Sequence, residues 1–230
     1  METYRAIYER ALERKGSSAQ LEALLSQPLS TAQLQRLSDD AWLEEFTRKI
    51  FQSGFYWSVI NAKWSGFREV FWDFNIDKLL MMSPEMLEQK AADERIVRNF
   101  KKVQTVPENC YMIYETAQQH GSFSNFVAQW PSTDIIGLWQ YLKKQGARLG
   151  GNTGAYALRS MGKDTFVLSR DVEAYCRAHE VIDGGLHSKR SLTAIQAMFN
   201  DLQQQSGRSL QELSLLIAYS VGDNRVGIAS

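Results

Sequence analysis

A glycine-rich segment, LGGNTGAYAL at residues 149–158, is one of two places where the residue types indicate a function. Three glycines within residues 149–154 open a predicted helix, which leaves backbone N–H groups free to face an anion. Such a nest at a helix N-terminus binds phosphate. The alternative is an ordinary helix-turn-helix in which glycine allows close packing. The candidate phosphate contacts are Gly150, Gly151, Asn152, Thr153, Gly154, Lys144 and Arg148.

The second segment, WLEEFTRKIFQSGFYWSVINAKWSGFREVFWDF at residues 42–74, has a distinctive order. A predicted helix ends near Gln52, a short turn follows, and Tyr56 and Trp57 open the next helix. The electron-rich faces of such rings attract cations, and a desolvated contact of this kind contributes about 2 kcal/mol. Ordinary core packing is the alternative, and we prefer it for Phe51.

The elements that position these residues are predicted to be helical almost throughout, because apolar residues recur at helical spacing. Only residues 164–168 (DTFVL) resemble a strand, and they are too few to found a sheet. We therefore predict an all-α fold of roughly ten or more helices. The apolar stripes include Leu43, Phe46, Ile50, Ile60, Trp64, Phe67 and Phe71. The expected helix starts are Ser30, Asp39, Ser83, Ser132, Ser191 and Ser209.

Composition places the chain among globular proteins. Its 230 residues are 44% hydrophobic and 23% charged, with 26 basic and 26 acidic residues, which excludes a disordered chain. No apolar run is long enough to cross a membrane, and the N-terminal METYRAIYERALERKG lacks the apolar core of a signal peptide. Two cysteines favour reduced thiols over a disulfide framework. We expect a cytoplasmic protein that does not contact membranes.

Together the two segments resemble the 3-methyladenine DNA glycosylase I family. That family has a Q-x-G-x-x-W run before a helix ending in F-R-x-x-F, and later a hairpin L-K-K-x-G-F-x-F-x-G-x-T-x-x-Y-x-F. Here the hairpin reads LKKQGARLGGNTGAYAL, and an intervening IVRNFKK resembles the family's I-x-R-N…K helix. The resemblance runs collinearly from about residue 42 to about residue 160. The positions that match the first motif are Gln52, Gly54, Trp57, Phe67, Arg68 and Phe71.

The resemblance implies an all-α, helix-hairpin-helix DNA glycosylase fold with two helical lobes around a cleft. It implies a single domain over residues 1–230, with the hairpin at about residues 143–162. The implied activity is base-excision repair: the enzyme binds double-stranded DNA containing alkylated bases, flips an alkylated purine and hydrolyses its N-glycosidic bond. We expect a monomer that needs no cofactor.

The resemblance also implies roles for individual residues. Trp57 and Tyr56 would stack on the flipped base, and Gln52, Lys49 and Phe51 are further base-binding candidates. A cationic base is a good leaving group, so the enzyme mainly has to stabilise the oxocarbenium character of the sugar, for which a carboxylate is suited. The candidate catalytic acids are Asp171 and Glu45.

Both acids have ordinary alternatives. Asp171 begins a predicted helix, where a negative charge interacts favourably with the helix dipole. Glu45 lies four residues before Lys49, in the order that favours an ion pair on a helix.

Three departures from the family bear on activity. Lys49 stands where the family has a glutamate that contacts the base, and Ser169 stands where the superfamily has its catalytic aspartate. If Lys49 points into the pocket it should repel a cationic base, so the chain either prefers a neutral substrate or is a weakened catalyst. Ala155 occupies the place of the lysine of bifunctional members, so lyase chemistry is not expected.

The metal sites of related proteins are not matched. The first histidine is His120, so the family's zinc site at the chain ends is absent, and no four-cysteine pattern for an iron–sulfur cluster occurs. Cys176 and His179 supply only two of the four ligands of a structural zinc. We predict no metal.

Two other functions compete with excision. One is a family member that binds DNA or a nucleobase without cutting, because both expected carboxylate positions are substituted. The other is a small hydrolase built on Cys176 and His179, which would lack an orienting third group and an oxyanion hole.

Overall fold

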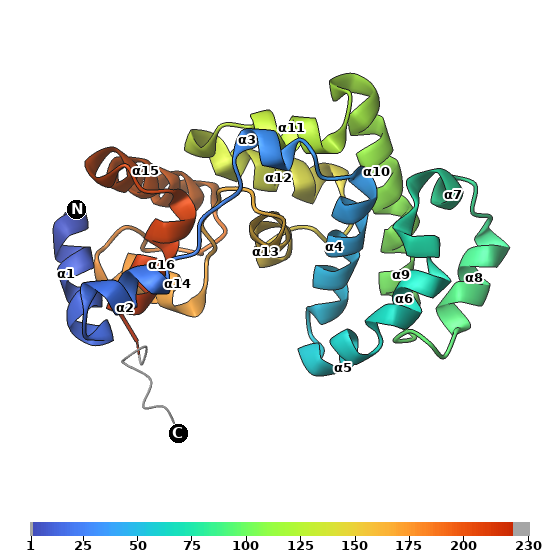
Figure 1. Cartoon of the computed structure of the whole chain (residues 1–230), viewed down its shortest axis with the longest axis horizontal. Helices are drawn as coiled ribbons and strands as arrows, with labels where there is room; N and C mark the ends of the chain where they lie inside the picture. The colour runs from blue at the N-terminus through green and yellow to red at the C-terminus, as the bar shows by residue number, and fades with distance from the viewer. Residues whose placement is uncertain (1, 223–230) are drawn as a thin grey trace. The chain divides into compact units, whose positions relative to one another are not determined.

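The computed structural model describes residues 2–222, which fold into helices joined by short connections, with no β-strand in that range (Figure 1). The all-α prediction is therefore confirmed. The chain divides into two compact units, and one of the boundaries between them falls within α12, Ile135–Gln145. Among the described residues, unit 1 comprises 2–29, 131–137 and 162–222, and unit 2 comprises 30–130 and 138–161.

Unit 2 is organised around α4, Asp39–Gln52, which packs against α10 and α13. Its predicted stripe is buried, since Leu43, Phe46 and Ile50 are at most 1% exposed. The remaining elements of unit 2 are α3 Thr31–Leu34, α5 Trp57–Ala62, α6 Trp64–Val70, η1 Trp72–Phe74, α7 Ile76–Leu80, α8 Pro84–Ala92, α9 Phe100–Val103, α10 Thr105–His120, α11 Phe123–Gln129 and α13 Asn152–Ser160.

Two acids at the start of α4 hold neighbouring helices in place. The Asp39 carboxylate accepts hydrogen bonds from the backbone N–H groups of Phe123 and Ser124 at 3.0 and 3.1 Å, where α11 begins. The Asp40 carboxylate accepts from the N–H of Ile76 at 3.0 Å, where α7 begins. Each carboxylate satisfies N–H groups that a helix start leaves unpaired. These hydrogen bonds fasten α7 and α11 to α4, the helix that carries Lys49 and Gln52.

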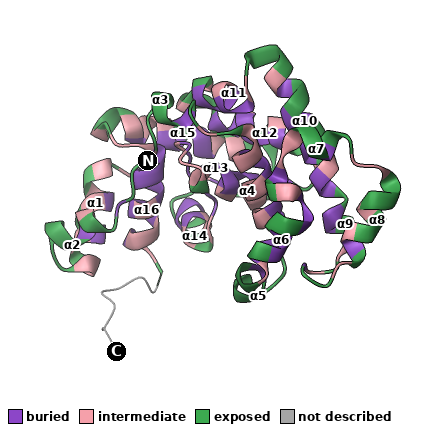
Figure 2. Ribbon diagram, turned by 45° about the vertical axis from the view of Figure 1, so that its right-hand side comes forward, coloured by how far each residue is buried: buried purple, intermediate pink, exposed green. Residues whose placement is uncertain are grey.

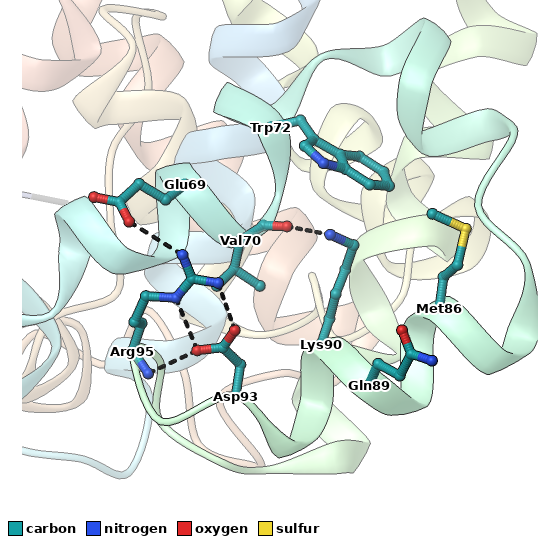
Figure 3. Close-up of a pocket in the computed structure, with 8 residues that line it drawn as sticks. All are labelled: Glu69, Val70, Trp72, Met86, Gln89, Lys90, Asp93 and Arg95. Atoms are coloured by element: carbon teal, nitrogen blue, oxygen red, sulfur yellow. Dashed lines mark hydrogen bonds and ion pairs between the residues drawn. The ribbon is translucent and has the colours of Figure 1, made fainter.

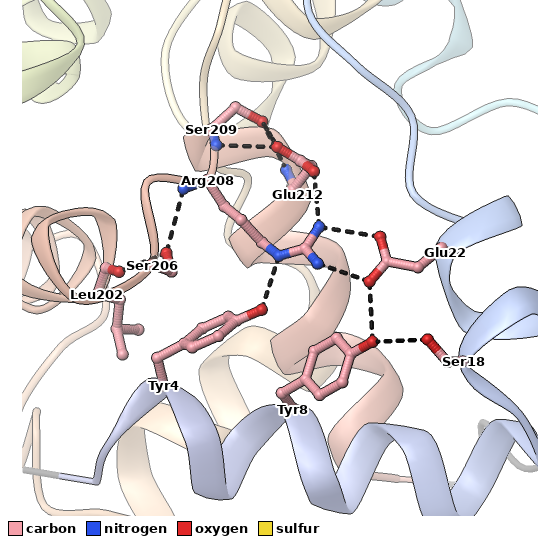
Figure 4. A network of polar contacts seen from close by, with 9 residues as sticks. All are labelled: Tyr4, Tyr8, Ser18, Glu22, Leu202, Ser206, Arg208, Ser209 and Glu212. Carbon is pink, nitrogen blue, oxygen red and sulfur yellow. Dashed lines mark hydrogen bonds and ion pairs between the residues drawn. The ribbon is translucent and has the colours of Figure 1, made fainter.

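Unit 1 is built on α16, Leu210–Ser220, which packs against α1, Tyr4–Lys15, and α14, Arg170–Ala178. The Arg208 guanidinium before α16 donates to Glu22 at 2.6 Å, to Glu212 at 2.9 Å and to the Tyr4 hydroxyl at 2.7 Å (Figure 4). Arg208 also holds the pKa of the Glu22 carboxyl below its ordinary value. The other elements of unit 1 are α2 Ser18–Ala23, η2 Ser132–Asp134 and α15 Lys189–Ser206.

Several helix starts differ from the predicted positions. Ser30, Ser83 and Ser209 are N-caps as predicted. Ser38, rather than Asp39, caps α4, since the Asp39 side chain is engaged with α11. Two further helix starts differ from the prediction. Ser188 rather than Ser191 is the N-cap of α15, and Ser132 begins a 3-10 turn that precedes α12.

The strand-like segment 164–168 forms no strand. It is an extended connection in unit 1, and Phe166 stacks on Phe199 of α15 with ring centres 4.1 Å apart. The N–H of Val167 donates to the Ser214 hydroxyl at 3.3 Å, on α16. The consecutive apolar residues Phe166, Val167 and Leu168 are thus buried, and the hydrogen-bond partner of the Val167 N–H is a side chain of α16.

No helix within residues 2–222 has the length and apolar character needed to cross a bilayer. Burial is one-sided along most helices, whereas α5 is almost entirely exposed, with only Ile60 buried (Figure 2).

Candidate functional site

A pocket of about 160 Å³ lies in unit 2, where the end of α4, the start of α5 and the start of α13 meet. It is smaller than the roughly 300–1,000 Å³ of sites that take drug-sized ligands, so it suits a single small ring system. It brings together residues from both predicted functional segments. Its lining residues are Lys49, Gln52, Ser53, Trp57, Asn152, Thr153 and Tyr156.

Trp57 is presented to the pocket by an exposed turn. Gly54 has a φ of +77°, which lets the chain reverse direction directly after α4. Trp57 then opens α5 and is 57% exposed, although indoles of folded proteins are mostly buried. An exposed ring at the edge of a pocket is available for stacking on a ligand.

Lys102 stabilises the turn after α4 by hydrogen bonds to its backbone. Its ammonium donates to the carbonyl oxygen of Phe51 at 3.2 Å and to that of Ser53, at the C-terminal end of α4. Lys102 is only 6% exposed, and its Nζ lies 4.5 Å from the centre of the Phe55 ring. Burial lowers the pKa of Lys102, and the charge of Arg148 adds to that effect. A buried cation therefore satisfies carbonyls that the helix end leaves unpaired.

We predict that Lys102→Met lowers the free energy of unfolding by about 1–3 kcal/mol, because it leaves buried carbonyl oxygens without donors. Urea denaturation measures the change. The matched control is Lys101→Met, since Lys101 is the exposed neighbour on the same helix. Equal stability of the two variants would contradict the role given to Lys102.

Lys49 lines the pocket and is also paired with Glu45. The two side chains are 3.1 Å apart, as the spacing on the helix predicts, and Arg48 approaches the same carboxylate at 3.6 Å. The Lys49 Nζ lies 5.7 Å from the centre of the Trp57 ring. Glu45 is not among the described residues that line the pocket, and its side chain is only 13% exposed.

Gln52 contributes a polar group that the fold leaves partly unused. The residue is 6% exposed, and its Nε2 donates to the Asn61 side-chain oxygen at 3.1 Å. Its Oε1 is buried and has no hydrogen-bond partner among the described residues. A buried acceptor without a donor costs free energy unless a ligand supplies one.

The hairpin is held by a residue that sequence reasoning missed. Asn109 of α10 is fully buried; its amide donates to the carbonyl of Ala147 at 3.1 Å and accepts from the N–H of Ala147 at 2.8 Å. Gly154 packs so closely that a Cβ would lie 2.5 Å from the carbonyl oxygen of Leu149. Gly151 caps α13 with φ +60° and ψ −138°, a conformation that favours glycine. The glycines therefore fit both interpretations of this segment. Gly154 allows close packing, and Gly151 adopts the backbone conformation at the open start of α13.

The remaining base and phosphate candidates occupy different environments. Phe51 is fully buried, with its ring 4.6 Å from Phe67, so it belongs to the core and not to the pocket lining. Tyr56 is 84% exposed, is the N-cap residue of α5 and is not among the described residues that line the pocket. Lys144 and Arg148 are exposed close to the hairpin. Two lining residues, Ser53 and Tyr156, were not among the candidates, although Tyr156 matches the tyrosine of the quoted hairpin pattern.

Asp171 lies in unit 1, in the first turn of α14, and is half-buried. The backbone of Gly222 lies directly beside it, so that a Cβ on Gly222 would be 2.7 Å from a carboxylate oxygen. Ser169 is the N-cap of α14 and accepts a hydrogen bond from the N–H of Val172 at 3.2 Å. Ser169 therefore has a structural role as a helix cap, and its side chain carries no carboxylate.

A second cavity of unit 2, about 290 Å³, is lined by charged side chains that are each paired within it (Figure 3). Arg95 pairs with Asp93 at 2.6 Å and holds the pKa of that carboxyl at about 2. The Lys90 ammonium lies 3.5 Å from the centre of the Trp72 ring and donates to the Val70 carbonyl. Because its charged groups are already paired, this cavity is a weaker candidate than the first.

The proposed cysteine nucleophile is inaccessible. Cys176 is fully buried, and burial raises the pKa of its thiol to about 12, so it carries almost no thiolate at neutral pH. The His179 ring lies 4.3 Å from that of Tyr175 at a tilt of 30°, and its Nε2 is 3.5 Å from Glu2. No group of three metal-ligating side chains occurs among residues 2–222. The geometry does not support a hydrolase at Cys176.

The sequence model of the methyladenine glycosylase family matches residues 34–150, half of the chain, including α4 and most of the residues around the pocket. The chain belongs to this family. The match confirms the prediction of a base-excision repair glycosylase, whereas a search of curated proteins finds no match.

Solved structures of the superfamily are similar to the chain. An 8-oxoguanine DNA glycosylase from Methanocaldococcus jannaschii is 17% identical, with a TM-score of 0.55 over 94% of this chain and 93% of that one. The glycosylase/lyase of the same organism, in complex with DNA, is 16% identical with a TM-score of 0.53, over 93% and 96%. A 3-methyladenine DNA glycosylase I from Staphylococcus aureus is 20% identical with a TM-score of 0.49, over 62% and 82%. The first two confirm the helix-hairpin-helix glycosylase fold.

Proposed function

We propose that this member of the methyladenine glycosylase family is a monofunctional DNA N-glycosylase, which flips an alkylated purine into the pocket beside Trp57 and hydrolyses its N-glycosidic bond. The observation that carries the proposal is the shared pocket of α4, Trp57 and the hairpin residues Asn152 and Thr153. A flipped base must regain by stacking the few kcal/mol that extrusion costs. An exposed indole beside a pocket can supply that stacking.

The hairpin is the proposed contact with the DNA backbone. The N–H groups at the start of α13 and the exposed side chains of Lys144 and Arg148 lie on either side of Gly151 in sequence. Backbone N–H groups and cations hold phosphate without reading sequence. The complex of the M. jannaschii glycosylase/lyase with DNA supports DNA as the partner of this chain.

Hydrolysis without a covalent intermediate needs a carboxylate and a positioned water. We propose Asp171 as the carboxylate. Glu45 is the competing candidate, and it ranks second because its carboxylate already pairs with Lys49 and Arg48. The proposal of a monofunctional enzyme rests on Ala155, which occupies the place of the lysine of bifunctional members, and on the pairing of Lys49, the amine that lines the pocket. An ammonium paired with Glu45 has no free electron pair with which to form a Schiff base.

We predict that the protein releases free base from methylated duplex DNA and leaves abasic sites in an intact strand. Borohydride is expected to trap no protein–DNA adduct, because trapping requires a Schiff base. Chromatography of the released base and denaturing gels of the strand measure both results. A borohydride-dependent adduct would contradict the monofunctional assignment, and an adduct lost in Lys49→Gln would identify the amine.

The second candidate function is binding of damaged DNA without excision. It is favoured by the serine that caps α14 where the superfamily has an aspartate. Lesion-dependent duplex binding with no released base would support it.

A further inference from the structure

The charge of the pocket points to a substrate class. Lys49 and Gln52 are three residues apart on α4, so their side chains share one face of the helix. Among the described lining residues Lys49 is the only charged one, and none is acidic. Its ammonium lies within reach of the Trp57 ring, 5.7 Å from the ring centre. The exposed Trp57 ring thus already interacts with a cation, the Lys49 ammonium.

A base that carries a positive charge would meet this ammonium at close range. An incoming cation stacked on Trp57 would lie within a few ångströms of Lys49, and like charges at that distance repel strongly where water is excluded. The partner of Lys49, Glu45, is shared with Arg48 and does not line the pocket. The pocket therefore disfavours ring-alkylated bases that are cationic.

The polar groups of the same face complement a neutral base. The Gln52 Oε1 is a buried acceptor with no partner among the described residues, and the Nε2 of the same amide donates to Asn61. The Lys49 ammonium is a donor. An acceptor and a donor on one helix face match a lactam edge, in which a ring N–H stands next to a carbonyl oxygen.

We propose that the pocket selects neutral modified bases with a lactam edge, whose N–H donates to Gln52 and whose carbonyl accepts from Lys49, over cationic alkylated bases. This inference rests on the proposed function, because it assumes that the flipped base enters this pocket. It narrows the substrate class from alkylated purines in general to neutral ones.

The test uses two duplexes that differ by one charge. One carries 7-methylguanine, which is cationic in DNA, and the other carries 7-methyl-7-deazaguanine, its neutral isostere with the same lactam edge. We expect the wild-type protein to bind the neutral duplex about tenfold more tightly. Lys49→Gln should bring the affinity ratio close to one. The matched control is Lys78→Gln, an exposed lysine of unit 2, which should leave the ratio unchanged.

A second variant tests the lactam contact. Gln52→Met keeps the length of the side chain and removes the acceptor, so it should weaken both lesion duplexes about tenfold and leave their ratio intact. Unchanged affinities would overturn the Gln52 contact.

Base release is measured in the same samples so that failures can be told apart. The proposed selectivity is wrong if the wild-type protein binds the cationic duplex as tightly as the neutral one, or if Lys49→Gln leaves the affinity ratio unchanged. In either case, release of bases by the wild-type protein means that the proposed function stands. If neither lesion is bound better than undamaged DNA and no base is released, both are wrong.

Discussion

Trp57→Ala is expected to reduce the rate of base release by roughly 5- to 150-fold, since base–aromatic stacking contributes about 1–3 kcal/mol per base. The indole is 57% exposed, so its removal takes little from the core. The loss should therefore fall on lesion binding and catalysis, with the unfolding transition nearly unchanged. Single-turnover release from a lesion duplex, together with thermal unfolding, measures the two effects.

Two further variants sharpen this prediction. Trp57→Phe keeps an aromatic face and should recover most of the lost rate. Tyr111→Ala removes a ring of nearly equal exposure, 58%, on α10 outside the pocket lining, and should release base at the wild-type rate. If Tyr111→Ala were as slow as Trp57→Ala, the loss would reflect general damage to the surface rather than stacking.

Asp171→Asn is expected to lower base release at least about a hundredfold while lesion-duplex affinity stays within about twofold, because a charge that stabilises the oxocarbenium-like transition state acts on the chemical step. If Asp171 serves only the dipole of α14, the variant should instead lose about 0.3–1 kcal/mol of stability and keep its activity. Single-turnover rates, duplex affinity and urea denaturation separate the two roles.

The matched control for Asp171 is in the same helix turn. Glu173 is the other first-turn acid of α14 and pairs with Arg177 at 2.7 Å, so Glu173→Gln should keep full activity. Glu45→Gln tests the competing carboxylate. Loss of activity in Glu45→Gln with retention in Asp171→Asn would assign the catalytic charge to Glu45.

The fold class was predictable because the apolar stripes are local. Phe46 and Ile50 of α4 are buried as their spacing indicates, and one helix suffices to read that pattern. The segment 164–168 was not predictable in the same way. Its apolar character reflects burial of Phe166 against Phe199, which is more than thirty residues away in the chain.

The candidate site was predictable in part for the same reason. The motifs at α4 and at the hairpin indicated Gln52, Trp57 and Asn152, and the structure places these in one pocket. Asn109 and Lys102 were not recognisable as supports of the site. Each acts on a backbone segment at least 38 residues away, so sequence spacing carries no trace of the contact.

Lys49 shows what the sequence left open. Its spacing from Glu45 indicated an ion pair, and its place at the family's glutamate position left open whether it enters the pocket. The side chain both pairs with Glu45 and lines the pocket. The two alternatives for Lys49 are therefore compatible.

The most direct test of a flipped base in the Trp57 pocket is the release of free base by the wild-type protein from duplexes that each carry one modified purine, cationic or neutral. We predict that at least one of these duplexes yields free base and an abasic site in equal amounts, at a rate that saturates with protein concentration. Binding that is indifferent to the lesion, with no base released from any duplex, would contradict the account.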